Sequence, residues 1–186
     1  TYDDNGNVIF FGSDNYGWNY RDRMASSTVA GVKTYYGYDF NNDRVTKGDG
    51  TATTTYANKY FSQDDTGTST KHIFDNSGLV LAAIEGGGQA TSTHTIHTDR
   101  LGGTSVVVSE TGDVLESFDF MPFGDTRVDN KTGSYTEDLQ FTGYEKDSES
   151  DLSYAKNRYY EEDSGKYLSQ DIVFQNLITD GRRDIA

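Results

Sequence analysis

The sequence predicts an all-β protein built from antiparallel hairpins. Its acidic residues are mostly aspartate, 22 Asp against 8 Glu, and 11 Asn and 20 Gly accompany them. Asp, Asn and Gly favour turns, whereas Glu, the better helix former, is scarce. The 14 tyrosines suit half-exposed strands, because the ring can be buried while the hydroxyl stays in water.

Strand-like runs and turn signals alternate along the chain. Short apolar or alternating runs are separated by Gly-, Asn- or Asp-rich segments at intervals of about ten residues, which is the pattern of hairpins. The clearest runs are residues 8–11, 34–38, 44–46, 51–56, 71–74, 79–84, 104–108 and 114–120, and the turns between them include 39–43, 75–78 and 110–113.

No segment keeps the helical period of 3.6 residues over several turns. The best helical candidate is the segment from Leu152 to Glu162, but it lacks a convincing cap. The pair Tyr159-Tyr160 within it favours a strand. We therefore expect strands in this segment as well.

The segments are also related to one another. Residues 2–8 begin with Tyr-Asp and lead through a turn to a β-branched residue, and residues 38–45 repeat this order. A weaker copy lies at residues 74–80. Such repeats at irregular spacing predict stacked hairpins rather than a single compact sandwich.

Composition limits the functional classes. The formal net charge of -14 argues against nucleic acid or an anionic membrane as the main partner. No apolar run approaches the roughly 20 residues that a membrane-spanning helix needs. The absence of cysteine excludes disulfides, cysteine-based zinc sites and a cysteine nucleophile. No signal peptide is visible in the first residues, Thr1-Tyr2-Asp3-Asp4.

Five blocks, in family order, resemble the YD-repeat (Rhs-repeat) proteins and their repeat-associated core. The first two are similar to the aromatic and Tyr-Asp steps of a repeat. The other three resemble the core's His-Thr-Asp box, its Pro-Phe-Gly box, and its final series of Phe-Thr-Gly, Arg-Tyr-Tyr and Leu-Ser-x-Asp steps. The blocks are residues 16–24, 36–45, 97–104, 116–124 and 141–171.

This resemblance implies a long β-sheet wound as a spiral into a hollow shell or barrel. It implies that residues 1–60 are YD-type repeats, that 61–171 form the Rhs repeat-associated core, and that 172–186 are a C-terminal segment at the start of a further region. In bacterial toxin systems such a shell encloses a C-terminal toxic domain, and in related animal adhesion proteins it forms an extracellular scaffold.

From the resemblance we expect a non-enzymatic structural segment of a secreted or cell-surface protein of bacterial origin. Its expected partners are flanking repeats or further copies of the same chain at the sheet edges, and an enclosed C-terminal toxin. No nucleic-acid partner, membrane span or cofactor is expected. The alternative is an extracellular adhesion or glycan-binding module, or a self-associating structural subunit, that uses exposed aromatic residues and sheet edges.

The chain departs from the family pattern at several positions. Arg100 and Gly103 replace the usual His and Ser, Glu161-Glu162 replaces Asp-Pro, and Ile172 replaces Pro. The later Asp-Pro-Gly boxes, which carry the aspartates implicated in self-cleavage in relatives, are not among these residues. Self-cleavage is therefore not carried over to this sequence.

The sharpest chemical cluster is His94, His97 and Asp99, with Glu116 and Asp125 elsewhere in the chain. On an extended strand the two histidines fall on opposite faces, while His97 and Asp99 share one. Two ligands are fewer than the three or four of a zinc site. A histidine that is hydrogen-bonded at a strand end is the preferred interpretation.

Three acidic segments fail as EF-hand calcium loops, because the required glycine or the final glutamate is missing. Loose surface calcium sites at the turns stay open as an alternative. The failing segments are the one around Gly6 with Gly12 at its last position, Asp39-x-Asn41-x-Asp43 and Asp147-x-Glu149-x-Asp151.

Signals for catalysis are weak. There is no Gly-x-Ser-x-Gly elbow, and Gly86-Gly87-Gly88 lacks the strand and helix that flank a phosphate loop. Glu161-Glu162-Asp163 are consecutive and cannot face one another across a cleft, as glycosidase carboxylates do, so we expect a solvated edge. We assign no catalytic, cofactor-binding or metal-ligating residues. The aromatic residues are expected to form cross-strand ladders, each pair contributing roughly 0.2–1 kcal/mol.

Overall fold

The computed structural model describes residues 1–78, 80–87 and 90–171. Its main feature is a sheet of 13 antiparallel strands in which each strand pairs with its neighbours in the sequence. We call this sheet the wall. Its strands are β1 (Phe10–Phe11), β2 (Asp14–Trp18), β3 (Met24–Val29), β4 (Val32–Tyr38), β5 (Arg44–Gly48), β6 (Thr53–Asn58), β7 (Phe61–Asp64), β8 (Ser69–Phe74), β9 (Val80–Gly87), β10 (Ala90–Thr98), β11 (Thr104–Val108), β12 (Val114–Phe120) and β13 (Thr126–Lys131).

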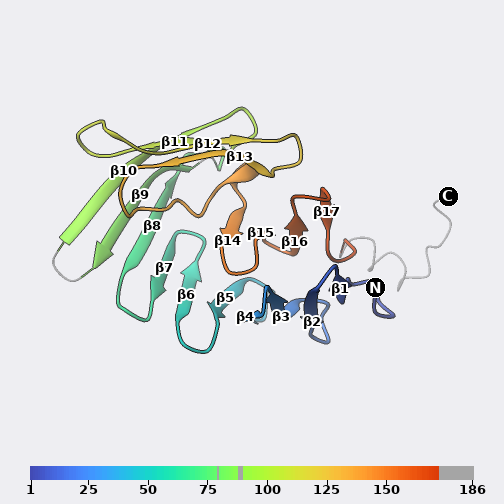
Figure 1. Cartoon of the computed structure of the whole chain (residues 1–186). Helices are drawn as coiled ribbons and strands as arrows, with labels where there is room; N and C mark the ends of the chain where they lie inside the picture. The colour runs from blue at the N-terminus through green and yellow to red at the C-terminus, as the bar shows by residue number, and fades with distance from the viewer. Residues whose placement is uncertain (79, 88–89, 172–186) are drawn as a thin grey trace.

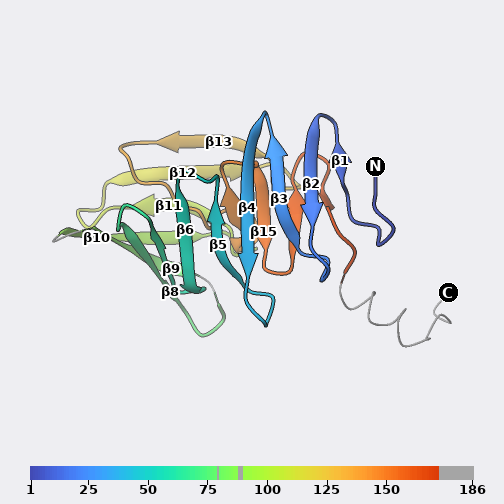
Figure 2. The same cartoon turned by 90° about the horizontal axis from the view of Figure 1, so that it is seen from below.

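A second, smaller sheet follows the wall in the chain. It has four strands, and we call it the inner sheet because it lies inside the curve of the wall (Figure 1). Seen from below, β15 lies behind β4 (Figure 2). A short 3-10 helix, η1 (Phe141–Gly143), precedes it, and its strands are β14 (Glu145–Asp147), β15 (Leu152–Ala155), β16 (Arg158–Glu161) and β17 (Lys166–Tyr167).

The predicted all-β fold is therefore confirmed, including strands in the segment from Leu152 to Glu162. The wall continues without interruption across residue 60, since β6 pairs with β7. The division into repeats (1–60) and core (61–171) stays a prediction. Residues 172–186 lie outside the described part of the chain. Among the described residues, no helix is long and apolar enough to cross a membrane.

One turn geometry recurs along the wall. In residues 39–43, the Asp39 carboxylate accepts hydrogen bonds from the Asn41 and Asp43 amides at 2.8 and 2.9 Å. Asn42 has a φ of 70°, a left-handed conformation that Asn and Gly tolerate best. The strand residues on either side of such a turn pair six positions apart. The pairs are Tyr2↔Val8, Trp18↔Met24, Tyr38↔Arg44, Phe74↔Val80, Thr98↔Thr104, Val108↔Val114 and Phe120↔Thr126.

These pairs include the three repeats that the sequence predicted, at Tyr2, Tyr38 and Phe74. In these turns a side-chain oxygen of the first residue, an Asp, Asn or Ser, accepts hydrogen bonds from backbone amides later in the turn. This explains why the Asp of a Tyr-Asp step is followed by a tight turn. The local sequence therefore sets both the turn and the register of the strands that leave it.

Two apolar clusters hold the inner segments against the wall. In the first, Tyr16, Met24 and Tyr36 of the wall contact Leu152 and Tyr159 of the inner sheet. The second brings Tyr135 and Leu139 onto β9 to β11, and its wall members are Val80, Ala83, Ile96 and Val107. Burial of these side chains is the main force that keeps the inner segments in place.

Candidate functional site: the enclosed interior between the two sheets

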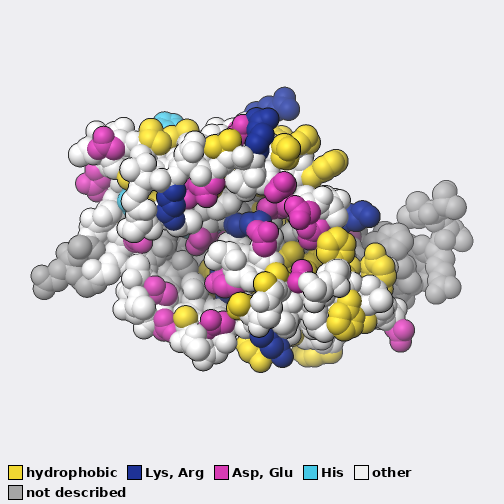
Figure 3. Space-filling view, viewed as in Figure 1, with side chains coloured by type: hydrophobic (Ala, Val, Ile, Leu, Met, Phe, Trp, Pro, Cys, Tyr) yellow, Lys and Arg dark blue, Asp and Glu magenta, His cyan; other side chains and the backbone are white. Residues whose placement is uncertain are grey.

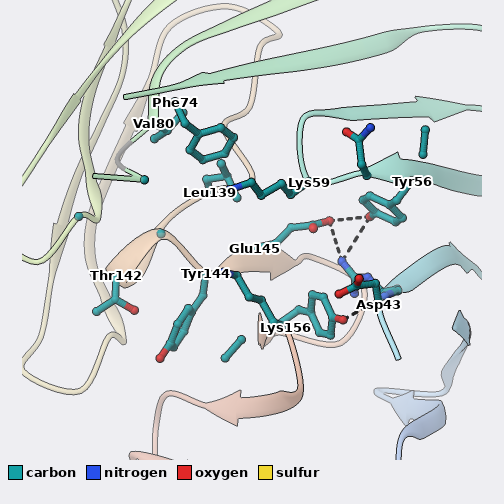
Figure 4. Close-up of a pocket in the computed structure, with 18 of the residues that line it drawn as sticks. Asp43, Tyr56, Lys59, Phe74, Val80, Leu139, Thr142, Tyr144, Glu145 and Lys156 are labelled. Atoms are coloured by element: carbon teal, nitrogen blue, oxygen red, sulfur yellow. Dashed lines mark hydrogen bonds and ion pairs between the residues drawn. The ribbon is translucent and has the colours of Figure 1, made fainter. Parts of the chain in front are cut away.

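A cavity of about 750 Å³ lies between the wall and the inner sheet. Lys59, Phe74 and Leu139 border one end of it, and Tyr144 and Glu145 border the other (Figure 4). In the space-filling view from the same direction as Figure 1, basic and acidic side chains lie next to one another near the middle of the molecule (Figure 3). The cavity is therefore mixed in character, with apolar and charged parts close together.

Arg44 on β5 is the centre of the first charged group. Its guanidinium is buried and lies 2.7 Å from Glu145 and 2.6 Å from Asp147, both on β14. It also donates hydrogen bonds to the Tyr56 and Tyr159 hydroxyls at 3.3 and 3.1 Å. Burial alone would lower the pKa of Arg44, but Asp147 and Glu145 more than offset it, so the pKa lies well above its ordinary value.

Lys47 extends this group along the same strand. Its ammonium lies 3.2 Å from Asp147 and 3.1 Å from Glu149. Burial opposes its charge, yet Asp147 raises the pKa of Lys47 above its ordinary value. Tyr56 donates to Glu145 at 2.5 Å. We call Arg44, Lys47, Tyr56, Glu145 and Asp147 the arginine contact, in which each carboxylate has a cationic partner.

A second charged group forms where the segment after β13 packs against β8 and β12. Glu137 is fully buried, and its carboxylate lies 3.0 Å from the Nε2 atom of His72. It accepts a hydrogen bond from the Tyr135 hydroxyl at 2.7 Å. The amide of Glu137 donates in turn to Glu116 at 2.8 Å. We call His72, Glu116, Tyr135, Glu137 and the neighbouring Asp138 the carboxylate contact.

The carboxylate contact contains few cations, and the pKa values of two of its carboxyl groups are raised. Burial raises the pKa of Glu116 to about 7, against the opposing hydrogen bond from the Glu137 amide. Asp138 has an exposed side chain but borders a small cavity with His72 and Glu145. Desolvation and the charge of Glu145 raise the pKa of Asp138, but solvent screens this effect because the side chain is exposed. Burial lowers the pKa of His72, but Glu137 more than offsets this and raises it.

Both contacts join the wall to an inner segment. In the arginine contact the carboxylates of the inner sheet are neutralised by wall cations, and their oxygens are engaged by hydrogen bonds and ion pairs. Such groups are occupied in holding two sheets together. The chemistry that the arrangement supports is therefore attachment of the inner sheet to the wall.

The histidines of the sequence cluster are separated. His94 is buried and stacks on Tyr135 with ring centres 3.9 Å apart, whereas His97 is exposed on the other face. The opposite faces that the sequence predicts for these two histidines are confirmed. A register shift follows His97, and Asp99 leaves the strand to cap a turn through the Leu101 and Gly103 amides. The expectation that His97 and Asp99 share a face is therefore wrong, because a bulge intervenes.

The remaining candidates lie apart as well. Glu116 is buried in the carboxylate contact, and Asp125 is exposed in a turn. Asp39 caps its own turn, and Asp147 belongs to the arginine contact. In the described part of the chain, no three His, Asp or Glu side chains are placed to hold a metal ion together.

The expected solvated edge at residues 161–163 is wrong for Glu162. This side chain is buried, accepts a hydrogen bond from Ser153 at 2.5 Å and pairs with Lys146 at 2.5 Å. Both partners lie on strands of the inner sheet, β15 and β14, so this buried carboxylate is paired there rather than solvated.

Aromatic residues make contacts both between the two sheets and across neighbouring strands of the inner sheet. The rings of Tyr36 and Tyr159 lie 5.0 Å apart, and Tyr159 also contacts Tyr154 at 5.2 Å. Phe118 and Phe120 stack at 5.8 Å within one strand. The expected cross-strand pairs are present in the inner sheet, where Tyr154 lies opposite Tyr159 and Tyr160 lies opposite Tyr167, and Tyr36–Tyr159 adds a contact between the sheets.

Sequence reasoning missed Arg44, Lys47, His72 and Glu137, and it considered Asp147 only as a calcium ligand. Strand alternation would place Arg44 and Lys47 on opposite faces, whereas both are buried on β5. A strand whose inward positions carry cations requires acidic partners from another element. The sequence does not indicate which element that is.

A family model described as Teneurin YD-shell matches residues 1–185. The protein described as "tRNA3(Ser)-specific nuclease WapA", from Bacillus spizizenii, is 26% identical over 182 residues, which cover 92% of this chain and 8% of that protein. The family resemblance that the sequence motifs indicated is thereby confirmed.

Solved structures share the fold. The crystal structure of TcdB2-TccC3 matches with a TM-score of 0.76 at 18% identity, over 92% of this chain and 10% of that chain. The Photorhabdus luminescens Tc holotoxin pore matches with a TM-score of 0.74 at 18% identity, over 91% of this chain and 9% of that chain. This chain therefore spans about a tenth or less of the length of these relatives.

Proposed function

The chain belongs to the teneurin YD-shell family, and on that premise we propose that it forms part of the wall of a hollow β-shell that encloses a C-terminal toxin domain. In this proposal the chain is a structural segment without catalytic activity of its own. Residues 1–60 supply YD-type repeats, and residues 61–171 supply the repeat-associated core with its inner sheet.

The observation that carries the proposal is the attachment of the inner sheet to the concave face of the wall. The arginine contact and the first apolar cluster fix the inner sheet, and a cavity of about 750 Å³ stays open beside it. A curved sheet that presents paired charges and apolar side chains to an interior is suited to closing off a space.

The relatives support the proposal at the level of whole proteins. The structures named TcdB2-TccC3 and the Tc holotoxin pore share the fold, and one of the TcdB2-TccC3 structures is described as lacking a hypervariable C-terminal region. The nuclease named WapA is matched over 8% of its length. We attribute any nuclease or toxic activity of the polypeptide to a region other than these residues. We also propose that the protein is bacterial and is secreted or displayed at the cell surface.

Protease protection tests the proposed enclosure. The polypeptide that carries this chain is purified from its source and treated with a protease of broad specificity, with and without a denaturant that opens the shell. We expect the C-terminal domain to stay intact until the wall unfolds. Digestion of that domain in the native protein at the rate of an isolated domain would contradict the proposal.

A matched pair of variants sharpens this test. Arg44→Met removes the buried cation of the arginine contact, whereas Arg127→Met removes an exposed arginine that pairs with Asp119 on the wall. We expect Arg44→Met to expose the enclosed domain to protease and Arg127→Met to leave it protected. If the C-terminal domain is equally protected from protease in both variants, the arginine contact is not needed to close the shell.

A further inference from the structure

Three basic side chains are buried in the described part of the chain, namely Arg23, Arg44 and Lys47. Arg44 and Lys47 share the carboxylate of Asp147, at 2.6 and 3.2 Å. Arg23 is 5% exposed, and it has no ion-pair partner among the described residues. A buried cation without an anion nearby is unfavourable. Arg23 therefore requires a negative charge that the described residues do not supply.

The hydrogen bonds of Arg23 leave one edge of its guanidinium free. Nη1 donates to the backbone oxygen of Asn157, in the turn between β15 and β16, at 2.5 Å. Nε is buried without a partner, and Nη2 makes no hydrogen bond with the described residues. A guanidinium binds a carboxylate or a phosphate through two parallel N–H groups. The Nε and Nη2 atoms of Arg23 present such a pair.

Arg44 shows that the free edge alone does not distinguish Arg23. The Nε atom of Arg44 also lacks a partner, but its charge is compensated, since Nη1 meets Asp147 and Nη2 meets Glu145. Arg23 differs because a neutral backbone oxygen is its acceptor in the described part of the chain. The uncompensated charge next to a free pair of N–H groups is what indicates an anion site.

Arg21 adds a second cation to the same turn, residues 19–23. Its Nη1 donates to the backbone oxygen of Asp39 at 2.9 Å, and its Nε is also buried without a partner. Asp22, between the two arginines, accepts hydrogen bonds from two asparagine side chains at 2.9 and 2.8 Å. The turn therefore carries two guanidinium groups, and neither forms an ion pair with the described residues.

More positive charge lies on the inner-sheet side of the contact. Asn157 stands between Lys156 and Arg158 in the sequence. Lys156 borders the cavity (Figure 4) and has no ion-pair partner among the described residues, whereas Arg158 pairs with Asp171 at 2.9 Å. Cations thus gather at this contact although the chain has a net charge of -14. Lys156 and Asn157 are exposed, so ions in solution reach this turn.

We propose that the Nε–Nη2 edge of Arg23 is a binding site for a small oxyanion of the phosphate class, taken from solution. Two oxygens of such an ion accept the two free N–H groups, and its charge compensates the buried guanidinium. The ion lies where the wall turn 19–23 meets the turn of the inner sheet that holds Asn157. It therefore strengthens a further attachment of the inner sheet, beside the arginine contact and the first apolar cluster. The site does not depend on the proposed function, because it concerns how the inner sheet is held and not what the shell encloses.

Direct measurement of phosphate binding tests the site. Inorganic phosphate is offered to the polypeptide that carries this chain, and bound phosphate is measured by equilibrium dialysis at constant ionic strength, with chloride as the other anion. Arg23→Lys keeps the positive charge but removes the pair of parallel N–H groups. We expect it to weaken phosphate binding about ten-fold or more, because a hydrogen bond to a charged group is lost.

Arg127→Lys is the matched control, since it makes the same change at an exposed arginine that already pairs with Asp119. We expect phosphate binding to be unchanged in this variant. Equal binding by the two variants contradicts the site. An absence of phosphate binding to the wild type also overturns it, and shows that another group of the polypeptide, such as a carboxylate, already compensates Arg23.

Hydrogen–deuterium exchange of the wild type gives a readout that does not depend on whether a variant folds. Phosphate that bridges the two turns slows the exchange of amides in both. At a phosphate concentration about ten times the dissociation constant, we expect the amides of residues 19–23 and 155–158 to exchange about ten-fold more slowly than in chloride. The turn at residues 109–113, which contains no basic residue, is the internal standard. Exchange that phosphate leaves unchanged, or slows equally at residues 109–113, overturns the proposal.

Discussion

The arginine contact and the carboxylate contact attach inner segments to the wall in different ways. In the arginine contact, Arg44 and Lys47 offset the charges of Glu145 and Asp147. In the carboxylate contact, Glu137 pairs with His72, whereas Glu116 and Asp138 form no direct ion pair among the described residues. Apolar packing is similar in the two regions, because each contact lies beside a buried cluster.

The difference shows how the balance of buried charge determines the response to pH. The cations of the arginine contact have pKa values above their ordinary range, so their charge is constant from pH 5 to pH 8. The carboxylate contact contains the buried Glu116, whose pKa is raised to about 7. Between the ordinary pKa of a glutamate and pH 7 the folded protein retains a proton that the unfolded chain releases. Its free energy of unfolding therefore falls as the pH rises through this window.

His72 acts in the same direction. Its pKa is raised in the folded protein, so the stability it contributes is fully present below pH 6.5 and is lost as the pH rises through its folded value. The carboxylate contact should therefore be tighter at pH 5 than at pH 8, whereas the arginine contact should be insensitive between these values.

The largest expected effect is that of Arg44→Met. Removal of one partner from a buried ion pair leaves the other charge uncompensated, which costs about 3–5 kcal/mol. We expect a loss of this size in the free energy of unfolding at pH 8, measured by urea denaturation, and a smaller loss at pH 5, where the buried carboxylates left without Arg44 can take up protons. Arg127→Met, at an exposed pair with Asp119, should cost less than about 1 kcal/mol. A loss below 1 kcal/mol for Arg44→Met would show that the arginine contact is not a stabilising attachment.

Apolar truncation should affect both regions alike. Leu152 in the first cluster and Ile96 in the second are 1% and 4% exposed. Leu152→Ala and Ile96→Ala should each cost about 2–5 kcal/mol, because a buried aliphatic side chain leaves a cavity. Thermal denaturation at pH 5 and pH 8 measures this, and the cost should be the same at both values. A cost that changes with pH would mean that apolar packing and charge are coupled.

Replacement of Glu116 should remove much of the pH response. Glu116→Gln keeps the shape of the side chain and an acceptor for the Glu137 amide, but removes the titrating group. We expect the free energy of unfolding at pH 8 to rise by about 1–3 kcal/mol, since one pKa unit corresponds to about 1.4 kcal/mol. At pH 5 we expect little change. Urea denaturation at the two pH values checks this, and the exposed Glu110→Gln serves as control.

The smallest effect concerns the turns. Residues 121–125 follow the recurrent turn geometry, with a hydrogen bond from Gly124 to Met121, but Met121 has no side-chain oxygen to accept the free amides. Met121→Asn should therefore stabilise the protein by about 0.5–1 kcal/mol, and Asp39→Ala should destabilise it by a similar amount. Differential scanning calorimetry measures both, and a destabilising Met121→Asn would contradict this account of the turn.

Much of the fold could be predicted from the sequence. The aromatic-Asp steps at Tyr2, Tyr38 and Phe74 marked turns that the structure confirms. The scarcity of helix formers predicted correctly that the described residues contain no α-helix. Much less of the site could be predicted. The cluster of His94, His97 and Asp99 was the sharpest pattern in the sequence, yet a bulge separates its members. Arg44 gave only a weak signal, because its partners lie on another sheet.

The sequence by itself determined the turns, the strands and their register, because these depend on interactions within a few residues. The Asp39 carboxylate reaches amides two and four positions away, and this local geometry fixes how the next strand pairs. Only the tertiary structure decided which charges meet. Arg44 and Asp147 are 103 residues apart in the chain, and His72 and Glu137 are 65 apart. They come together because the wall curves around the inner segments, and that curvature is a property of the whole sheet.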